Sequence, residues 1–264
     1  MRSTASANPL LLCAGRLLKV RFVVSMLLFS LFFSACKKDS ELDMDPETLD
    51  TRWMKLSIPG QLRGISAIYG NIDDTLVVAS LYHLYRTTDR GLTWQRIYEG
   101  ELGISGLYMY NGELCALGSF IDQAGSSTGH HPFLFSQDFG NTWKREGKYD
   151  YSVYTDIFVL RNRAAVDDST YFEIAPNIYT VEDQRKGLLP QPDTLQLVRN
   201  DISTPVYFPF SRRVNCLYLD EQKRLYVGAE GTRFEWSTKG SSKVYPTSTD
   251  SALLYISRSP LLSW

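Results

Sequence analysis

The chain of 264 residues carries 28 Lys and Arg residues and 29 Asp and Glu residues. Without the first 35 residues, which hold four of the basic residues and no acidic one, the balance is 24 basic to 29 acidic, a net charge of −5. This balance argues against a nucleic-acid partner, which would need a basic stripe, and the remaining 229 residues are ample for one domain with a real core.

The beginning of the chain has the three parts of a secretory signal peptide. Arg16, Lys19 and Arg21 form a basic region that no acidic residue accompanies, and the apolar run Phe22–Phe33 follows it. Small residues come directly after the run, which is the order typical of secretory signals. The run is shorter than the roughly 20 apolar residues that span a bilayer. Residues 1–35 are therefore predicted to be a signal peptide that lies outside the fold.

The tetrapeptide FSAC, which ends at Cys36, resembles the lipobox of bacterial lipoproteins. In that family the cysteine thiol is diacylated and becomes the new N-terminus, and Phe33 stands where the family usually has Leu. The alternative is a plain signal peptide whose cysteine is incidental. A lipid on Cys36 would anchor the protein to a membrane, since each buried CH₂ contributes about 0.8 kcal/mol.

Residues 36–51 are predicted to be an acidic, solvated tether. The segment has almost nothing apolar to bury, and its acidic residues are Asp39, Glu41, Asp43, Asp45, Glu47 and Asp50. Lys37 follows the cysteine, where lipoproteins of the inner membrane often have Asp, which favours the outer membrane. Whether the domain faces the periplasm or the cell surface is left open, although the Lys- and acid-rich start resembles the surface-export signal of Bacteroidetes-type lipoproteins.

Apolar and polar residues alternate with a period of two through most of residues 52–264. Aromatic and β-branched residues are abundant, and no convincing amphipathic helix appears. Short strands with turns every 8 to 12 residues indicate an all-β sandwich, barrel or propeller.

Two long units share one plan. Gly64–Ile97 and Gly103–Glu146 both begin with the tripeptide GIS, and they contain the similar turns TTDRGLTW and SQDFGNTW. The second unit is longer by an insertion, DQAGSSTGHHP, between its middle strands. Asp89 and Asp138 of the two turns are 49 residues apart (138 − 89). A fixed period of this length indicates a repeat architecture.

Weaker copies extend the pattern along the chain. Thr170–Leu189 fits a third unit without the turn, and Val214–Gly240 fits a fourth with a degenerate turn at Ser237. Ser251–Ser257 is predicted to be the first strand of a fifth unit. Thr51–Pro59 resembles the last strand of a unit and is expected to close the ring by completing the final blade.

The pattern S/T-x-D-x-G-x-T-W has a physical reading as a turn. The Asp carboxylate can accept hydrogen bonds from backbone N–H groups just ahead of it, and Gly supplies the positive φ of a short hairpin. The Trp brings a large apolar ring that packs one blade against its neighbour. The predicted structural residues of the two turns are Thr87, Asp89, Gly91, Thr93, Trp94, Ser136, Asp138, Gly140, Thr142 and Trp143.

This turn resembles the Asp-box, or bacterial neuraminidase repeat, of the sialidase and sortilin-like superfamily, over most of residues 52–257. In that superfamily the fold is a β-propeller, and the Asp-box joins the outer strands of each blade, away from the central funnel where ligands bind. The resemblance implies a propeller of about five blades in residues 52–264, either a complete ring or one truncated at its C-terminus. It also implies that Asp89 and Asp138 are structural and not a catalytic pair.

No catalytic residue is predicted. The surroundings of Arg63 and Arg86 lack the FRIP motif of sialidases. Arg212 and Arg213 are adjacent in a predicted strand, so their side chains should point to opposite faces.

No metal and no cofactor are predicted either. The pair at His130 and His131 is expected in a solvated loop, since no metal-ligand pattern accompanies it. Cys115 and Cys216 are expected to be isolated core thiols, with a disulfide between them as the alternative.

Two functions are consistent with these features. The first is a non-catalytic, membrane-anchored lipoprotein whose propeller binds a protein or a glycan, for which tyrosine-rich segments such as Glu146–Tyr154 are suited. The second is a divergent, sialidase-like glycoside hydrolase with a non-standard funnel. An acid pair and an arginine cluster that converge in the funnel would favour the hydrolase.

Overall fold

The computed structural model describes residues 50–60, 64–121, 127–148, 157–175, 178–180, 188–190, 192–236, 244–249 and 251–261. The signal peptide, most of the tether and Cys36 lie outside these ranges, as do Arg63 and Ser237. The elements are all β-strands, and they belong to one compact unit, Pro46–Trp264. In the described part of the chain, no helix is long and apolar enough to cross a membrane.

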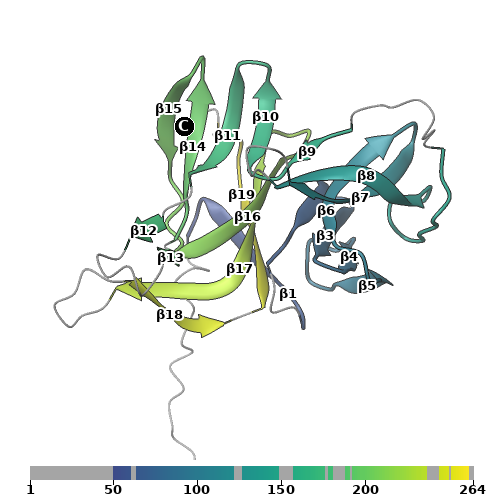
Figure 1. Ribbon diagram of the computed structural model, residues 1–264, viewed down its shortest axis with the longest axis horizontal. Helices are drawn as coiled ribbons and strands as arrows, with labels where there is room; N and C mark the ends of the chain where they lie inside the picture. Colours follow the sequence, from purple (N-terminus) through teal and green to yellow (C-terminus); the bar gives the residue numbers. More distant parts are fainter. Residues whose placement is uncertain are drawn as a thin grey trace, which may run out of the picture. The chain divides into compact units, whose positions relative to one another are not determined.

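Apart from one two-stranded hairpin, the described strands form four sheets, which are the four blades of a β-propeller (Figure 1). Blade 1 consists of β2 (Ala67–Gly70), β3 (Leu76–Ser80), β4 (His83–Thr87) and β5 (Gln95–Glu99). Blade 2 consists of β6 (Ile104–Tyr110), β7 (Glu113–Ile121), β8 (Ser127–Ser136) and β9 (Val159–Leu160). Blade 3 consists of β10 (Arg163–Asp167), β11 (Thr170–Ala175), β14 (Thr194–Arg199) and β15 (Ile202–Val206).

Blade 4 contains both an early and a late part of the chain. Its order is β16 (Arg212–Leu219), β17 (Leu225–Trp236), β19 (Ala252–Ser257) and β1 (Trp53–Ile58), and β18 (Val244–Thr249) pairs with β17. A separate hairpin joins β12 (Ile178–Thr180) to β13 (Leu188–Pro190). The four blades are close to the predicted number of about five. The inner strands are β2, β6, β10 and β16; β2 contacts β6 and β16, and β16 contacts β10.

The segment around β1 completes the last blade, as its sequence predicts. The antiparallel register runs from Trp53 opposite Ser257 to Ile58 opposite Ala252. The prediction that Ser251–Ser257 starts a fifth unit is wrong. These residues form β19, which pairs with β17 on one side and β1 on the other. A strand that is buried at every position, as β19 is, fits the middle of a sheet as well as its inner edge, so the sequence did not distinguish the two.

The third unit also differs from its prediction. Thr170–Leu189 was expected to hold its strands, but blade 3 runs from Arg163 to Val206. The hairpin of β12 and β13 interrupts it between β11 and β14. Its last two strands are joined at Asn200 and Asp201, both with positive φ, as in a two-residue hairpin turn.

Three apolar clusters pack neighbouring blades together. One joins blades 3 and 4, and its large members include Trp53 and Phe172. A second joins blades 4 and 1, with Trp94 packed against it, and a third joins blades 1 and 2, with Trp143 packed against it. The two Trp rings therefore lie where one blade meets the next, in the position predicted for them.

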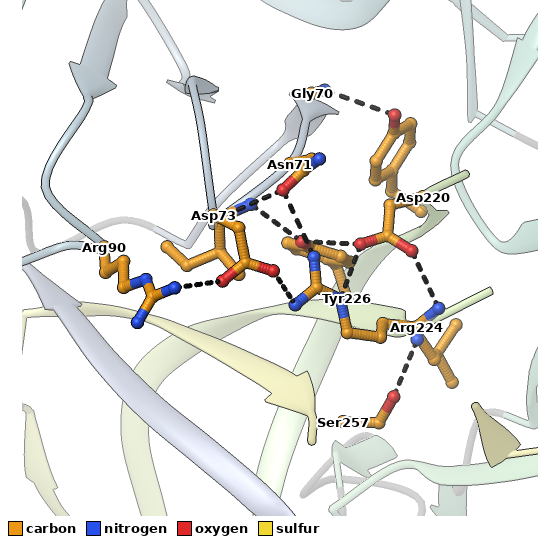
Figure 2. A network of polar contacts seen from close by, with 11 residues as sticks. Gly70, Asn71, Asp73, Arg90, Asp220, Arg224, Tyr226 and Ser257 are labelled. Atoms are coloured by element: carbon orange, nitrogen blue, oxygen red, sulfur yellow. Dashed lines mark hydrogen bonds and ion pairs between the residues drawn. The ribbon is translucent and has the colours of Figure 1, made fainter. Parts of the chain in front are cut away.

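A polar network binds blade 1 to blade 4 at the ends of their inner strands (Figure 2). Arg224 lies at its centre and donates to Asp220 at 2.7 Å and to Asp73 at 2.6 Å. The hydroxyl of Tyr226 donates to Asp220 at 3.0 Å and accepts from the backbone N–H of Ile72 at 3.0 Å. Asp220 and Tyr226 are buried, and burial raises the pKa of Tyr226 above its usual value.

Tyr226→Phe tests this network. It removes the acceptor of the Ile72 N–H and one donor to Asp220, so two buried polar groups lose a partner. We expect the free energy of unfolding to fall by about 1–3 kcal/mol, measured by urea denaturation. The matched control, Tyr82→Phe, removes a hydroxyl from a side chain that is 38% exposed and should change stability by less than about 0.5 kcal/mol. Equal stability of the two variants would contradict the role of the network.

Candidate functional site

A cavity of about 470 Å³ lies where the chain enters the inner strands of blades 1, 2 and 4. Its lining comprises Gly64, Ser66, Leu81, Gly103, Ile104, Ser105, Ser119, Arg161, Asn215 and Glu230. Three blades and the segment that leads into blade 3 contribute to it. The cavity thus occupies the face of the ring on which the inner strands begin.

Three polar residues of the lining occupy the same position in three different blades. Ser66 lies four residues before Gly70, which pairs with Leu76. The two other inner strands repeat this spacing. Ser105 lies four residues before Met109, which pairs with Leu114. Asn215 lies four residues before Leu219, which pairs with Leu225. The repeated fold therefore directs one hydroxyl or amide from each of these blades to the same place.

The repeated tripeptide GIS is the sequence signal of this cavity. Its glycines, Gly64 and Gly103, and its serines, Ser66 and Ser105, all line it. A Cβ on Gly64 would lie 1.8 Å from the amide nitrogen of Asn215. A side chain at Gly64 would therefore have to displace the Asn215 amide, which packs directly against the backbone of blade 1.

The lining also carries one charge of each sign. Glu230 lies on β17, and its carboxylate makes no hydrogen bond or ion pair with any residue that the structure describes. The carbonyl of Arg161 accepts from the backbone N–H of Leu217 at 2.8 Å, which fixes this segment against β16. Burial raises the pKa of Cys216 to about 12, and the guanidinium charge of Arg161 opposes that rise.

Hydrogen bonds hold the wall in place. Ser66 Oγ donates to the carbonyl of Ile104 at 2.6 Å, which joins blade 1 to blade 2. Ser80 Oγ donates to the carbonyl of Gly64 at 3.4 Å. The inner-strand entrances are thus fixed before any ligand arrives, which lowers the entropic cost of binding.

The two predicted turns lie at the opposite ends of their blades. Thr87 pairs with Leu76 at the start of β3, whereas Ser80 at its other end adjoins the cavity residue Leu81. In the first turn, Asp89 accepts from the backbone N–H of Thr93 at 2.9 Å and from the Thr87 hydroxyl at 2.8 Å. The side-chain hydrogen bond from Thr93 is the main cause that lowers the pKa of Asp89.

The second turn has the same hydrogen bonds. Asp138 accepts from the N–H and the hydroxyl of Thr142 at 2.8 and 2.7 Å and from the Ser136 hydroxyl at 2.8 Å. The backbone N–H of Gly140 donates to Ser136 Oγ at 2.7 Å, as Gly91 does to Thr87 in the first turn. Both glycines have positive φ. The N–H of Thr142 is the main cause that holds the pKa of Asp138 well below its usual value.

A third position of this kind exists at Ser257, which sequence reasoning missed. Thr87 pairs with Leu76, the first residue of β3. Ser136 pairs with Leu114, the second residue of β7. In blade 4 the N–H of the corresponding Leu225 donates to Ser257 Oγ at 2.9 Å. The sequence from there, SRSPLLSW, keeps Ser and Trp at the ends of the pattern but has Ser and Leu in place of Asp and Gly. With these substitutions the segment no longer matches the pattern; the degenerate turn predicted at Ser237 lies outside the described residues.

The other candidate residues have structural surroundings. Arg212 is buried and donates to the carbonyl of Gly231 at 2.7 Å, while Arg213, on the other face of the strand, lies 3.7 Å from Asp193. The loop predicted for His130 and His131 is wrong: both lie in β8, which continues the hairpin with β7 through two irregular steps.

The two cysteines and a further histidine, His83, also have structural surroundings. Cys115 and Cys216 are buried free thiols, as expected, and burial raises the pKa of Cys115 to about 11. His83 lies 3.4 Å from Glu99 on the neighbouring strand. Within the described residues, no group of three or more His, Cys, Asp and Glu side chains could hold a metal ion.

Comparisons with known proteins give remote likenesses only. No protein-family model and no curated protein matches the chain. Among solved structures, virginiamycin B lyase from Staphylococcus aureus is 10% identical, with a TM-score of 0.33 over 78% of this chain and 98% of its own. YCF48 bound to D1 peptide is 13% identical (TM-score 0.27; 76% and 71% covered). An α-L-arabinanase from Penicillium chrysogenum, complexed with arabinobiose, is 16% identical (TM-score 0.24; 78% and 66% covered). Likenesses this remote assign no family and no activity to the chain.

Asp138→Asn tests the turn through its pH dependence. The folded pKa of Asp138 is depressed, so its ionised form stabilises the fold above the unfolded pKa of about 3.9, and this contribution is lost as the pH falls. We expect the variant to unfold at lower urea concentration than the parent at pH 7, and the difference to shrink below about pH 4.

The matched control is Asp168→Asn, which neutralises an exposed carboxylate that makes no hydrogen bond with the described residues. A difference between parent and Asp138→Asn that is the same at pH 7 and pH 3 would show that the carboxylate charge is not what stabilises the turn.

Proposed function

We propose that the propeller is a non-catalytic binding module of a membrane-anchored lipoprotein, and that the cavity at the inner-strand entrances holds a polar segment of a protein or a glycan. One observation supports this most: Ser66, Ser105 and Asn215 occupy one position in three blades, and they converge on the cavity that Glu230 also lines. Binding sites of this kind place a few oriented polar groups in a concave pocket.

The chemistry of the lining suits a ligand rich in hydroxyl or amide groups. Hydroxyls donate and accept, an amide does both, and a carboxylate accepts from several donors. Because Glu230 makes no hydrogen bond or ion pair within the described part of the chain, a ligand donor would bind it without first displacing a protein partner. A charge-assisted hydrogen bond of this kind is stronger than a neutral one.

The alternative is a divergent glycoside hydrolase that uses the same cavity. Glycoside hydrolysis ordinarily takes two carboxyl groups about 5–9.5 Å apart, and Glu230 is the one carboxylate among the lining residues that the structure describes. The two functions differ in their products, since a binding module returns its ligand unchanged.

Glu230→Gln separates these functions. The protein would be applied to an array of bacterial surface oligosaccharides and to an array of synthetic peptides, and each bound probe would then be titrated. We expect the variant to bind its probe at least about tenfold more weakly, a loss of about 1.4 kcal/mol, and the parent to return that probe intact by mass spectrometry.

The matched control is Asp74→Asn, which removes one exposed negative charge at the far end of β2 from Ser66. Equal weakening by both variants, or no probe bound on either array, would contradict binding at this cavity. Shortened oligosaccharide products that depend on Glu230 would establish the hydrolase instead.

Cys36→Ser tests the proposed anchor. We propose that lipid on Cys36, which lies outside the described residues, holds the protein on the outer membrane, on its periplasmic or its surface side. The substitution should move the protein from the membrane fraction to the soluble fraction, detected by immunoblotting. The control is Cys115→Ala, which removes a buried thiol of the propeller and should leave the protein in the membrane fraction. Retention of Cys36→Ser on the membrane would refute the anchor.

A further inference from the structure

A second concavity lies between the inner strands of blades 3 and 4. It has a volume of about 610 Å³, and residues of β9, β10 and β16 line it. Apolar side chains from Phe158 to Leu160 and from Leu217 to Leu219 form much of its wall. Phe158 is 48% exposed and Leu160 is 42% exposed. Exposed apolar side chains that line a concave surface are typical of sites that bind another molecule.

The wall of this groove is fixed by hydrogen bonds. The N–H of Leu217 donates to the carbonyl of Arg161, and the hydroxyl of Tyr218 accepts from the N–H of Gly70 at 3.2 Å. The groove therefore exists without a ligand, and binding would not have to form it.

The basic side chain of the groove already has partners. Arg163 lies 3.4 Å from a carboxylate oxygen of Glu173 and 4.5 Å from the ring centroid of Tyr171. Its charge is therefore offset within blade 3 and contributes little attraction for an anionic ligand.

Acidic residues lie at the end of the groove where both inner strands finish. Asp167 is the last residue of β10 and Asp168 follows it, and both line the groove beside Leu219, the last residue of β16. The pKa of Asp167 is lowered, mainly by the hydrogen bond that its carboxylate accepts from the backbone N–H of Ser169, and Asp167 therefore stays ionised.

We propose that this groove binds an extended polypeptide segment in which apolar side chains alternate with Lys or Arg. The apolar side chains would cover Phe158 and Leu160, while the cations would lie at the end formed by Asp167 and Asp168. Charge complementarity decides the class of partner, because the same end repels phosphate and acidic polymers. The groove shares no lining residue with the cavity around Glu230, although the two are neighbours, since Leu160 lines the groove and Arg161 lines the cavity.

The test measures fluorescence anisotropy of two labelled peptides with the full-length protein. The first alternates lysine with leucine and phenylalanine, and the second has glutamate at each lysine position. Asp168→Asn is compared with Asp74→Asn, and Leu160→Ser is compared with Ile202→Ser. Each pair makes the same chemical change at exposed residues, one at the groove and one away from it; Ile202 is 69% exposed.

We expect saturable binding of the lysine peptide alone. Asp168→Asn should weaken it about threefold and Leu160→Ser about tenfold, while both control variants stay within about twofold of the parent. Thermal unfolding of each variant confirms that it is folded. Equal binding of the glutamate peptide, equal effects of groove and control variants, or absence of saturable binding would each overturn the proposal. Loss of ligand at the Glu230 cavity would not affect this result.

Discussion

The pairing of β1 with β19 is the constraint on which the rest of the structure depends. It joins positions 204 residues apart (257 − 53) and gives blade 4 its outer strand. Without it, the core between blades 3 and 4 would lose Trp53, and the core between blades 4 and 1 would lose Ile58. Closing so long a loop costs chain entropy. The buried residues of both clusters offset that cost on the two sides of blade 4, and so does the network of Asp220, Arg224 and Tyr226.

The same closure explains why the two faces of the ring differ. Strand beginnings meet on one face, where Ser66, Ser105 and Asn215 repeat around the cavity. The turns after the inner strands meet on the other, where the Arg224 network holds blade 1 to blade 4. Both cavities depend on the position of β16, since Asn215 lines one and Leu217 lines the other.

Much of the fold was predictable because its signals are local. The two turns, the period-two strands and the closing segment before Pro59 can be recognised from short stretches of sequence. The cavity was not predicted because Asn215 and Glu230 belong to no motif; they become equivalent to other residues only through strand register. The repeated GIS marks the start of two units in the sequence, but nothing in the tripeptide shows that its Gly and Ser line a cavity. Ser257 was missed because its turn has lost the Asp and Gly that identify the others.

The position of β1 has a mechanical consequence. Tension applied through the residues before Asp50 would pull β1 along its own axis, in shear against β19. The six residue pairs from Trp53 with Ser257 to Ile58 with Ala252 would then bear the load together, and not one after another as when a hairpin is unzipped. The N–H groups of Arg52 and Trp53 both bind Asp50, so the first turn of chain ahead of the strand is itself fastened. A domain pulled from this end would resist detachment through its pairing with β19, a strand that is buried at every position.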